Sequence, residues 1–204
     1  MELTILAASG ATGLELTRQA LDRGHTVTAI ARTPERVTVD SPRLIRVKAD
    51  VHDPDSMSSA LAGSSVILSG LGIAGGDDPG ALAAGARSVI AARPRLVVWL
   101  GAYGTGRSAP AAGVLTRNLL RMLGPQLADK VAADTIVLDA GGIVFHAGPL
   151  SNGALSATRR AVGLDRAPRR PFPARVSRAT VAALMLDEAE NPGEPGTIRI
   201  PLQR

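Results

Sequence analysis

The stretch LTILAASGATGLELTRQALDRGHTVTAIAR, residues 3–32, decides the fold of this chain. The apolar run at 3–7 and the β-branched run at 26–31 are typical of buried strands, and the segment between them has helical spacing. Glycine and other small residues form the turn that joins the first strand to the helix. The stretch therefore predicts a strand–helix–strand unit with parallel strands.

The turn before the helix has the composition of a phosphate-binding turn. Glycine is needed where the backbone bends tightly, approaches a pyrophosphate or lets the helix pack on the sheet, and Gly10 and Gly13 supply two such positions. The third position holds Ala7, so the bend depends on whether the backbone angles there suit an L-residue. Free N–H groups at the helix start would bind phosphate, and we also assign to this site the turn residues Ser9, Ala11 and Thr12. The alternative is an ordinary crossover with a glycine-rich turn.

Short β-branched runs alternate with helical patterns along the rest of the chain. This alternation predicts a Rossmann-type, doubly wound α/β fold, with a mostly parallel sheet flanked by helices in a single domain, residues 1–204. We expect surface loops at 104–113 and 164–174. The predicted strands are 3–7, 26–31, 43–48, 65–69, 95–101, 142–146 and 197–201. The predicted helices are 12–23, 54–62, 80–92, 114–122, 125–139 and 177–189.

Composition excludes several classes of protein. The chain has no cysteine, which excludes disulfides and thiolate nucleophiles and favours a reducing compartment, so we expect a cytoplasmic protein. Three scattered histidines without cysteine argue against a zinc site, and no segment has the roughly 18 apolar residues of a membrane span. The net charge is +5, and a basic cluster lies at 165–178. Because this cluster has one aromatic residue, Phe172, and no DNA-binding motif accompanies it, we favour a solvated loop over nucleic-acid binding.

The opening stretch resembles the start of the atypical short-chain dehydrogenase/reductase proteins, which include NmrA-like and biliverdin reductase B-like members. The turn of that family usually reads GASGATG or GATGxTG. The resemblance continues in KADVHDPDSMSSALAGSSVILSGLG (48–72), RLVVWLGAYGTG (95–106) and SRATVAALMLDEAENPGEPGTIRI (177–200). It covers nearly the whole chain, is weakest in the middle, and implies a Rossmann fold with a nicotinamide cofactor.

The residue that ends the second strand selects the cofactor. NAD-specific sites place Asp or Glu there for the ribose 2′-hydroxyl, and this charge would repel a 2′-phosphate. Arg32 stands there instead and Arg36 follows, so a helical turn at TPER (33–36) would let both guanidinium groups bind one phosphate. The sequence therefore predicts NADP(H), and the resemblance implies the same, since biliverdin reductase B-like members have arginines at both positions. The alternative is two solvated arginines.

Further cofactor contacts are expected where the later strands end. Asp50 and Val51 resemble the family pair beside the adenine, where the carboxylate accepts from the exocyclic amine and the valine lies against the ring. Ligands of open α/β sheets bind at the carboxyl ends of the strands. We therefore also assign to the cofactor site the residues that end the fourth and fifth strands, Ser69, Gly70, Leu71, Gly72 and Gly101.

The catalytic residues of the larger short-chain dehydrogenase family are only partly present. That family uses a Tyr-x-x-x-Lys pair, in which lysine lowers the tyrosine pKa and orients the nicotinamide ribose, together with a serine at the end of strand five. By this resemblance Lys130 keeps the place of the lysine, whereas Gln126 replaces the tyrosine, and Gly101 and Ala102 leave no serine. An amide cannot donate a proton as a phenol can.

Two other residues are candidate proton donors. Tyr103, the only tyrosine, follows the fifth strand and is either a proton donor or lid, or a loop residue packed on the surface. His146 ends the sixth strand and has a side chain that titrates near neutral pH, so it is either a proton donor or a structural histidine.

Three functions remain open from sequence. The first is an NADPH-dependent reductase of a small carbonyl, quinone, flavin or enone, with Lys130 on the nicotinamide ribose and Tyr103 or His146 as proton donor. The second is a sensor that binds NADP(H) without turnover, and the third is a non-redox cyclase or isomerase on the same fold. The sequence does not specify the small-molecule substrate or the oligomeric state.

Overall fold

One long sheet organises the chain. The computed structural model describes residues 1–72, 80–113, 116, 124–168 and 172–203. In these residues an eight-stranded sheet has the order β3-β2-β1-β4-β5-β6-β10-β8, parallel throughout except for β8, which runs antiparallel to β10. The strands are β1 (Glu2–Leu6), β2 (Thr26–Ala31), β3 (Leu44–Lys48), β4 (Val66–Ser69), β5 (Leu96–Ala102), β6 (Ile143–Ala147), β8 (Arg160–Gly163) and β10 (Ile198–Leu202). A separate pair joins β7 (Leu150–Ser151) to β9 (Val176–Ser177).

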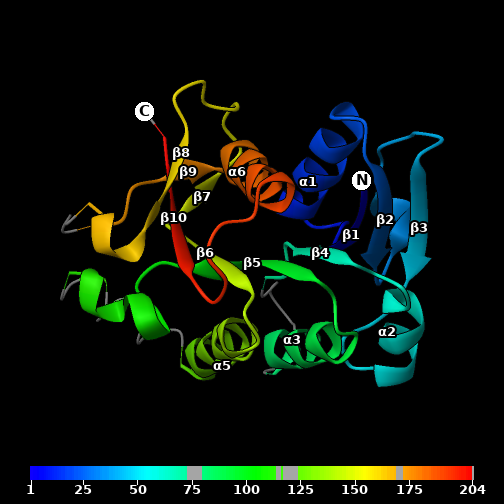
Figure 1. Cartoon of the computed structure of the whole chain (residues 1–204), viewed down its shortest axis with the longest axis horizontal. Coiled ribbons are helices and arrows are strands. Elements are labelled where there is room, and N and C mark those ends of the chain that lie inside the picture. The colour runs from blue at the N-terminus through cyan, green and yellow to red at the C-terminus, as the bar shows by residue number, and fades with distance from the viewer. Residues whose placement is uncertain (73–79, 114–115, 117–123, 169–171, 204) are drawn as a thin grey trace.

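Helices cover both faces of the sheet (Figure 1). The helices α1 (Ala11–Asp22) and α6 (Arg178–Glu190) lie on one face. The other face carries α2 (Pro54–Leu61), α3 (Ala81–Ala91) and α5 (Pro125–Asp139). Short 3-10 helices occur at η1 (Pro34–Arg36), η2 (Gly106–Ala111) and η3 (Leu164–Arg166). The doubly wound α/β fold predicted from the sequence is thereby confirmed.

Most predicted elements lie within one residue of their observed bounds. The exception is the helix expected at 114–122, which lies outside the described residues except for Thr116. The segment 104–113, expected to be a surface loop, contains η2 and buries Thr105 and Ser108. The hydroxyl of Thr105 donates to the carbonyl of Ala102 at the end of β5, and the hydroxyl of Ser108 accepts from the N–H of Gly104 and donates to the carbonyl of Thr105. The strands β7, β8 and β9 were not predicted.

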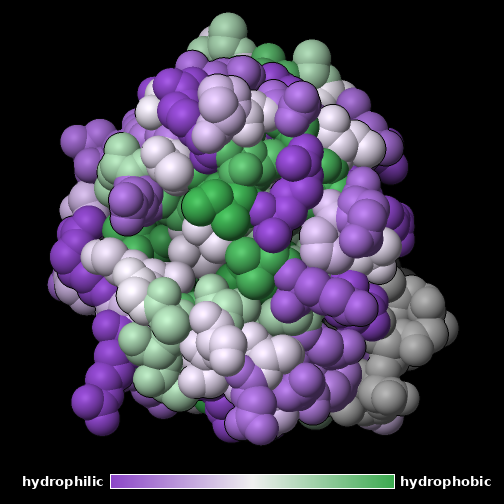
Figure 2. All heavy atoms as spheres, turned by 90° about the vertical axis from the view of Figure 1, so that its right-hand side faces the viewer, coloured by the Kyte–Doolittle hydropathy of each residue, from purple (hydrophilic) through white to green (hydrophobic). Residues whose placement is uncertain are grey.

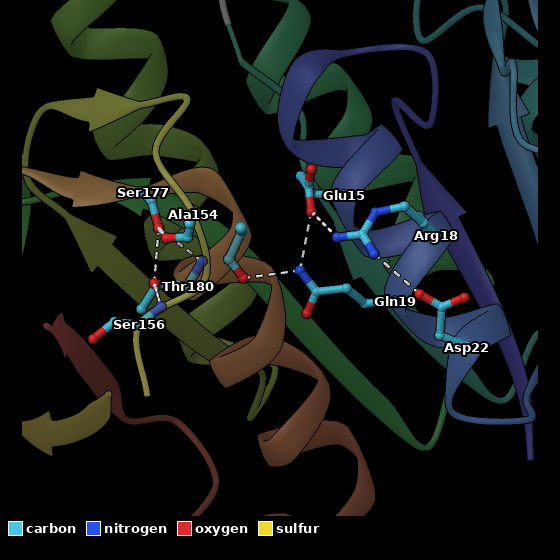
Figure 3. A network of polar contacts seen from close by, with 9 residues as sticks. Glu15, Arg18, Gln19, Asp22, Ala154, Ser156, Ser177 and Thr180 are labelled. Carbon is cyan, nitrogen blue, oxygen red and sulfur yellow. Dashed lines mark hydrogen bonds and ion pairs between the residues drawn. The ribbon is translucent and has the colours of Figure 1, made fainter. Parts of the chain in front are cut away.

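Polar contacts fix α6 beside α1 (Figure 3). The amide of Gln19 donates to the carbonyl of Ala179 over 2.9 Å and to the carboxylate of Glu15 over 3.1 Å. One turn later Arg23 donates to the carbonyl of Ala183, so both helices run in the same direction. Ser177 caps α6 by accepting from the N–H of Thr180. The two helices therefore begin at the same edge of the sheet.

The core has two parts, one under each helical layer. Trp99, on β5, is the only tryptophan of the chain; it is 1% exposed and packs in the core under α3 and α5. The edge strand β3 leaves Ile45 58% exposed, and Figure 2 shows apolar surface bordered by hydrophilic side chains on the side of the molecule where this strand lies. Exposed Arg46 and Lys48 beside Ile45 are the kind of charges that discourage edge-to-edge pairing.

Candidate functional site

A cavity of about 570 Å³ opens at the carboxyl ends of the central parallel strands. It lies where the strand order reverses between β1 and β4, the usual ligand position in open α/β sheets. Its size is that of a small-molecule or cofactor site. The predicted site residues that line it are Ala7, Ser9, Gly10, Ala11, Thr12, Arg32, Arg36, Val51, Gly70, Leu71, Gly72, Gly101 and Lys130.

The turn after β1 keeps its tight bend without the first glycine. Ala7 has a φ of 59°, in the left-handed region that alanine rarely adopts. Its carbonyl accepts a hydrogen bond from the N–H of Gly10 over 3.0 Å, which closes the turn. Gly13 does not line the cavity. It lets α1 pack closely on the turn after β1, because a Cβ at this position would lie 2.1 Å from the oxygen of Ala7.

The first turn of α1 has backbone N–H groups that can bind an anion. Gly10 is the N-cap residue and supplies no side-chain acceptor to the N–H groups that follow it. Ala11 and Thr12, which contribute such N–H groups, line the cavity. Unsatisfied N–H groups and the positive end of a helix together form an anion site, so the turn fits the pyrophosphate of a dinucleotide.

Two arginines border the cavity on the β2 side. Arg32 directly follows β2, and Arg36 ends the 3-10 helix η1, which forms the turn expected at TPER. Both side chains line the same cavity. The arrangement brings two permanent positive charges to the side where the sequence places a 2′-phosphate.

Two predicted cofactor residues act on the backbone instead of lining the cavity. The carboxylate of Asp50 accepts from the N–H of His52 over 3.0 Å, which shapes the turn after β3. Ser69 is fully buried, and its hydroxyl accepts from the N–H of Leu71 over 3.2 Å. Val51, His52 and Leu71 form part of the cavity lining, so Asp50 and Ser69 position residues that line it.

Lys130 lines the cavity from α5, on the β5 side. Burial lowers the pKa of Lys130, and the charges of Asp134 and Asp129 oppose this shift without cancelling it. Asp129 itself is buried and accepts from the N–H groups of Leu82 and Ala83, at the start of α3. The ammonium group thus lies in a poorly solvated part of the cavity wall.

Tyr103 does not line the 570 Å³ cavity. Its side chain is 8% exposed and its hydroxyl donates to the carbonyl of Ala111 over 2.8 Å. It contributes to a separate small hollow together with Pro168 and Pro173. Burial also raises the pKa of Tyr103, which makes the phenol a weaker acid.

His146 is fully buried beneath the cavity between a serine and an aspartate. Its Nδ1 lies 2.6 Å from Oγ of Ser108, and its Nε2 lies 3.0 Å from a carboxylate oxygen of Asp134. The second contact has the distance of an ion pair but not the angle of a good hydrogen bond. Oγ of Ser108 also donates to the carbonyl of Thr105 over 3.0 Å and accepts from the N–H of Gly104 over 2.9 Å, so the imidazole is joined through Ser108 to the backbone of the loop after β5.

A serine nucleophile is not available in this trio. Ser108 is 0% exposed and lies outside the cavity lining, so no substrate reaches its hydroxyl. The trio instead explains why strand five ends without a serine: a Cβ at Gly101 would lie 2.8 Å from Asp134 and 2.8 Å from His146.

Several site residues escaped prediction from sequence. Asp134 follows Lys130 by one helical turn, a spacing that could have identified it. Arg178 carries no such signal, because it enters the cavity lining only through the packing of α6 on α1; it donates to Asn152 over 2.6 Å. The other lining residues missed near this side are Leu100, Ala102, Ala147, Gly148 and Leu150.

Two negative findings apply to the part of the chain that the structure describes. It contains no group of three or more His, Asp or Glu side chains placed to bind a metal. None of its helices has both the length and the hydrophobicity that crossing a bilayer requires.

A family model described as NAD(P)H-binding matches residues 7–192. The chain belongs to this NAD(P)H-binding family. A search of curated proteins gave no match. The matched range includes the turn after β1, both arginines and Lys130, so the family model covers these residues of the cavity lining.

Solved structures with the same fold include NAD(P)-binding enzymes. The oxidoreductase ylbE from Lactococcus lactis is 16% identical with a TM-score of 0.82, over 100% of this chain and 91% of that chain. A short-chain dehydrogenase/reductase from Veillonella parvula, in complex with NADP, is 14% identical with a TM-score of 0.80, over 98% and 93%. The anaerobillin reductase ChuY from Escherichia coli O157:H7 is 17% identical with a TM-score of 0.79, over 100% and 97%. At these identities the likeness establishes the fold alone.

Proposed function

We propose that the protein is an NADPH-dependent reductase that transfers hydride to a small carbonyl, quinone, flavin or enone. The observation that carries the proposal is one continuous cavity with two arginines on its β2 side, a phosphate-binding turn at its centre and a half-buried lysine on its β5 side. Membership of the NAD(P)H-binding family and the reductases among its structural relatives support a redox role.

The residues present fit the cofactor along its length. Arg32 and Arg36 would bind the 2′-phosphate, Val51 would lie beside the adenine, and the first turn of α1 would bind the pyrophosphate. Lys130 would face the nicotinamide half. When bound, NADPH supplies the hydride, while the protein orients the substrate and limits access of water.

A binding protein without turnover is the second candidate. Gln126 stands in the place of the family tyrosine, and the side chains of Tyr103 and His146 bond within the protein. These observations favour a sensor of NADP(H). A non-redox enzyme on the same fold has no specific observation in its favour.

Substitution of the two arginines tests the cofactor assignment. We expect the double variant R32A/R36A to weaken NADPH binding by about 10- to 100-fold and NADH binding by far less, because the loss of charge-assisted bonds to a phosphate costs about 1.5–3 kcal/mol. Fluorescence titration with each cofactor measures the ratio. The exposed Arg87 on α3 gives the control R87A, and equal losses for NADPH and NADH would refute the assignment.

Turnover separates the two candidates. The wild-type protein should oxidise NADPH in the presence of at least one acceptor from a panel of quinones, flavins, enones and small ketones, followed by the loss of NADPH absorbance. Tight binding of NADPH with no oxidation by any acceptor would favour the sensor.

A further inference from the structure

An acidic residue that the proposed function does not use lies behind the cavity wall, close in the sequence to Lys130. Asp134 lies one helical turn after Lys130 on α5, the spacing at which side chains of a helix meet. It is 4% exposed, and one of its carboxylate oxygens lies 3.0 Å from Nε2 of His146 and 3.4 Å from Oγ1 of Thr105. A buried carboxylate with these partners has a fixed position.

The backbone of Gly101 separates this carboxylate from the cavity. Gly101 lines the cavity, and both oxygens of Asp134 lie within 2.9 Å of the place where its Cβ would be. The space that a strand-five side chain would occupy is therefore filled by Asp134 and His146, which approach from α5 and β6. Lys130, also in the lining, brings an ammonium group to the same part of the wall.

The remaining polar side chains in the lining are poor proton donors or lie away from the expected nicotinamide position. Arginine does not release its proton at ordinary pH, which excludes Arg178. His52 lies on the β3 side, next to Val51 and the predicted adenine position. Ser9 and Thr12 belong to the phosphate turn. Lys130 is thus the acidic group that the described lining offers on the nicotinamide side.

We propose that Lys130 delivers the proton that completes reduction, and that Asp134, held by His146, positions the ammonium group. This inference rests on the proposed reductase function. The substrate carbon accepts hydride from NADPH, its oxygen forms an O–H bond with a proton from Nζ of Lys130, and the N–H bond breaks. Lys130, left as the neutral amine, then takes a proton from water. Lys130 is the catalytic residue in this scheme, and Asp134 and His146 are positioning residues.

The charges around Lys130 determine how it titrates. Burial lowers its pKa, and Asp134 and Asp129 raise it. Of the elements packed against α5, β6 contributes His146, α3 contributes only the exposed Arg87, and η2 contributes Arg107, which pairs with Asp139 at 2.6 Å. Removing the charge of Asp134 should therefore lower the pKa of Lys130 further.

The lysine content of the chain allows a direct measurement without cofactor. Lys48 and Lys130 are the only lysines, so NMR of protein labelled in lysine gives two side-chain signals. We expect the Lys130 signal to titrate below 10.5, and the variant D134N to lower this pKa further. Lys48 on β3 is the internal reference, and D139N, an exposed change near the end of the same helix, is the matched control. An unchanged Lys130 pKa in a folded D134N would overturn the pairing.

Kinetics of K130R test the proton transfer and do not depend on the stability of D134N. Arginine keeps a positive charge at the cavity wall but does not donate a proton near neutral pH. We expect K130R to bind NADPH within a few-fold of wild type and to lose about 10²- to 10⁴-fold in turnover. The turnover of the wild type should fall at high pH as Lys130 loses its proton, and D134N should move that fall to lower pH.

The outcomes separate this inference from the reductase proposal. If the wild type oxidises NADPH and K130R matches its rate and pH profile, the role of Lys130 is refuted while the reductase stands. If the wild type binds NADPH but reduces no acceptor, the reductase proposal fails and the proton-delivery role fails with it, whatever the titration of Lys130.

Discussion

Ala7 holds a backbone conformation that favours glycine. Its φ of 59° brings the Cβ close to the following carbonyl oxygen, and glycine avoids this contact. We expect A7G to raise the free energy of unfolding by about 0.5–1 kcal/mol, because relief of strain outweighs the greater entropy of glycine in the unfolded chain. Denaturant unfolding measures the change. The neighbouring Ala8 is fully buried and outside the left-handed region, so A8G should destabilise the protein; a loss of stability in A7G would show that Ala7 is unstrained.

The place of a single residue could be predicted from sequence where it depends only on neighbouring residues. The turn pattern assigned Ala7, Gly10 and Thr12 to a cofactor site, and all three line the cavity, because they are close neighbours in one turn. The role of Tyr103 could not be derived in this way, because its hydrogen-bond partner, the carbonyl of Ala111, depends on the path of η2. Every residue has a backbone carbonyl, so the sequence does not show which carbonyl accepts a given hydrogen bond.

At the scale of elements, α3 depends on a cap from another helix. Its own N-cap residue, Gly80, has no side-chain acceptor, and Asp129 on α5 binds the N–H groups of Leu82 and Ala83 at 3.0 Å and 2.9 Å. The start of α3 is therefore fixed to α5 at Asp129, the residue that precedes Lys130.

Removing this cap should loosen both helices. We expect D129A to lower the free energy of unfolding by about 1–3 kcal/mol, because two buried N–H groups lose their acceptor. Chemical denaturation checks this, with the exposed D139A as the control. A loss in D129A no larger than that in D139A would mean that the N–H groups find other partners.

Helix and strand bounds followed from the sequence where the pattern was long. Alternating apolar runs and capping residues located α2 and α6 within one residue, because those signals act over a few neighbouring positions. The two-residue strands β7 and β9 gave no pattern, and the β8–β10 pair joins segments nearly 40 residues apart. Pairing over that distance is decided by packing.

At the scale of the molecule, the end of α6 is joined to the segment after α1. Glu190 accepts from His25 at 2.7 Å and from Arg23 at 3.0 Å. Burial raises the pKa of Glu190, but the hydrogen bonds from His25 and Arg23 lower it more, so it lies below the ordinary value of 4.5.

This pairing predicts a small pH dependence of stability. A lowered carboxyl pKa contributes stability above about pH 4.5, and this contribution is lost as the pH falls through the lowered value. We expect E190Q to cost less than about 1 kcal/mol at pH 7, because the pair is partly exposed, and to cost little at pH 3. Urea unfolding at both pH values checks this against E194Q, a change of an exposed glutamate in the following loop. The same cost at both pH values would contradict the ionic role.

The residues that line the cavity come from both neighbouring and distant parts of the sequence. Its β2 side and the turn after β1 could be predicted as parts of one candidate site because both lie within residues 3–36. Its β5 side combines residues from α5, β5, β6 and α6. Only the completed sheet brings these together, so the place of Arg178 in the lining could not be predicted from the sequence.

Trp99 gives the molecule an optical probe of its own. It is the sole indole of the chain, buried on β5 two residues before Gly101 in the cavity wall. Tryptophan emits at wavelengths that reduced nicotinamide absorbs, so resonance energy transfer from this one donor should quench its emission when NADPH or NADH binds and leave it much less affected by the oxidised cofactor. Occupancy and oxidation state can then be followed in real time on unlabelled protein.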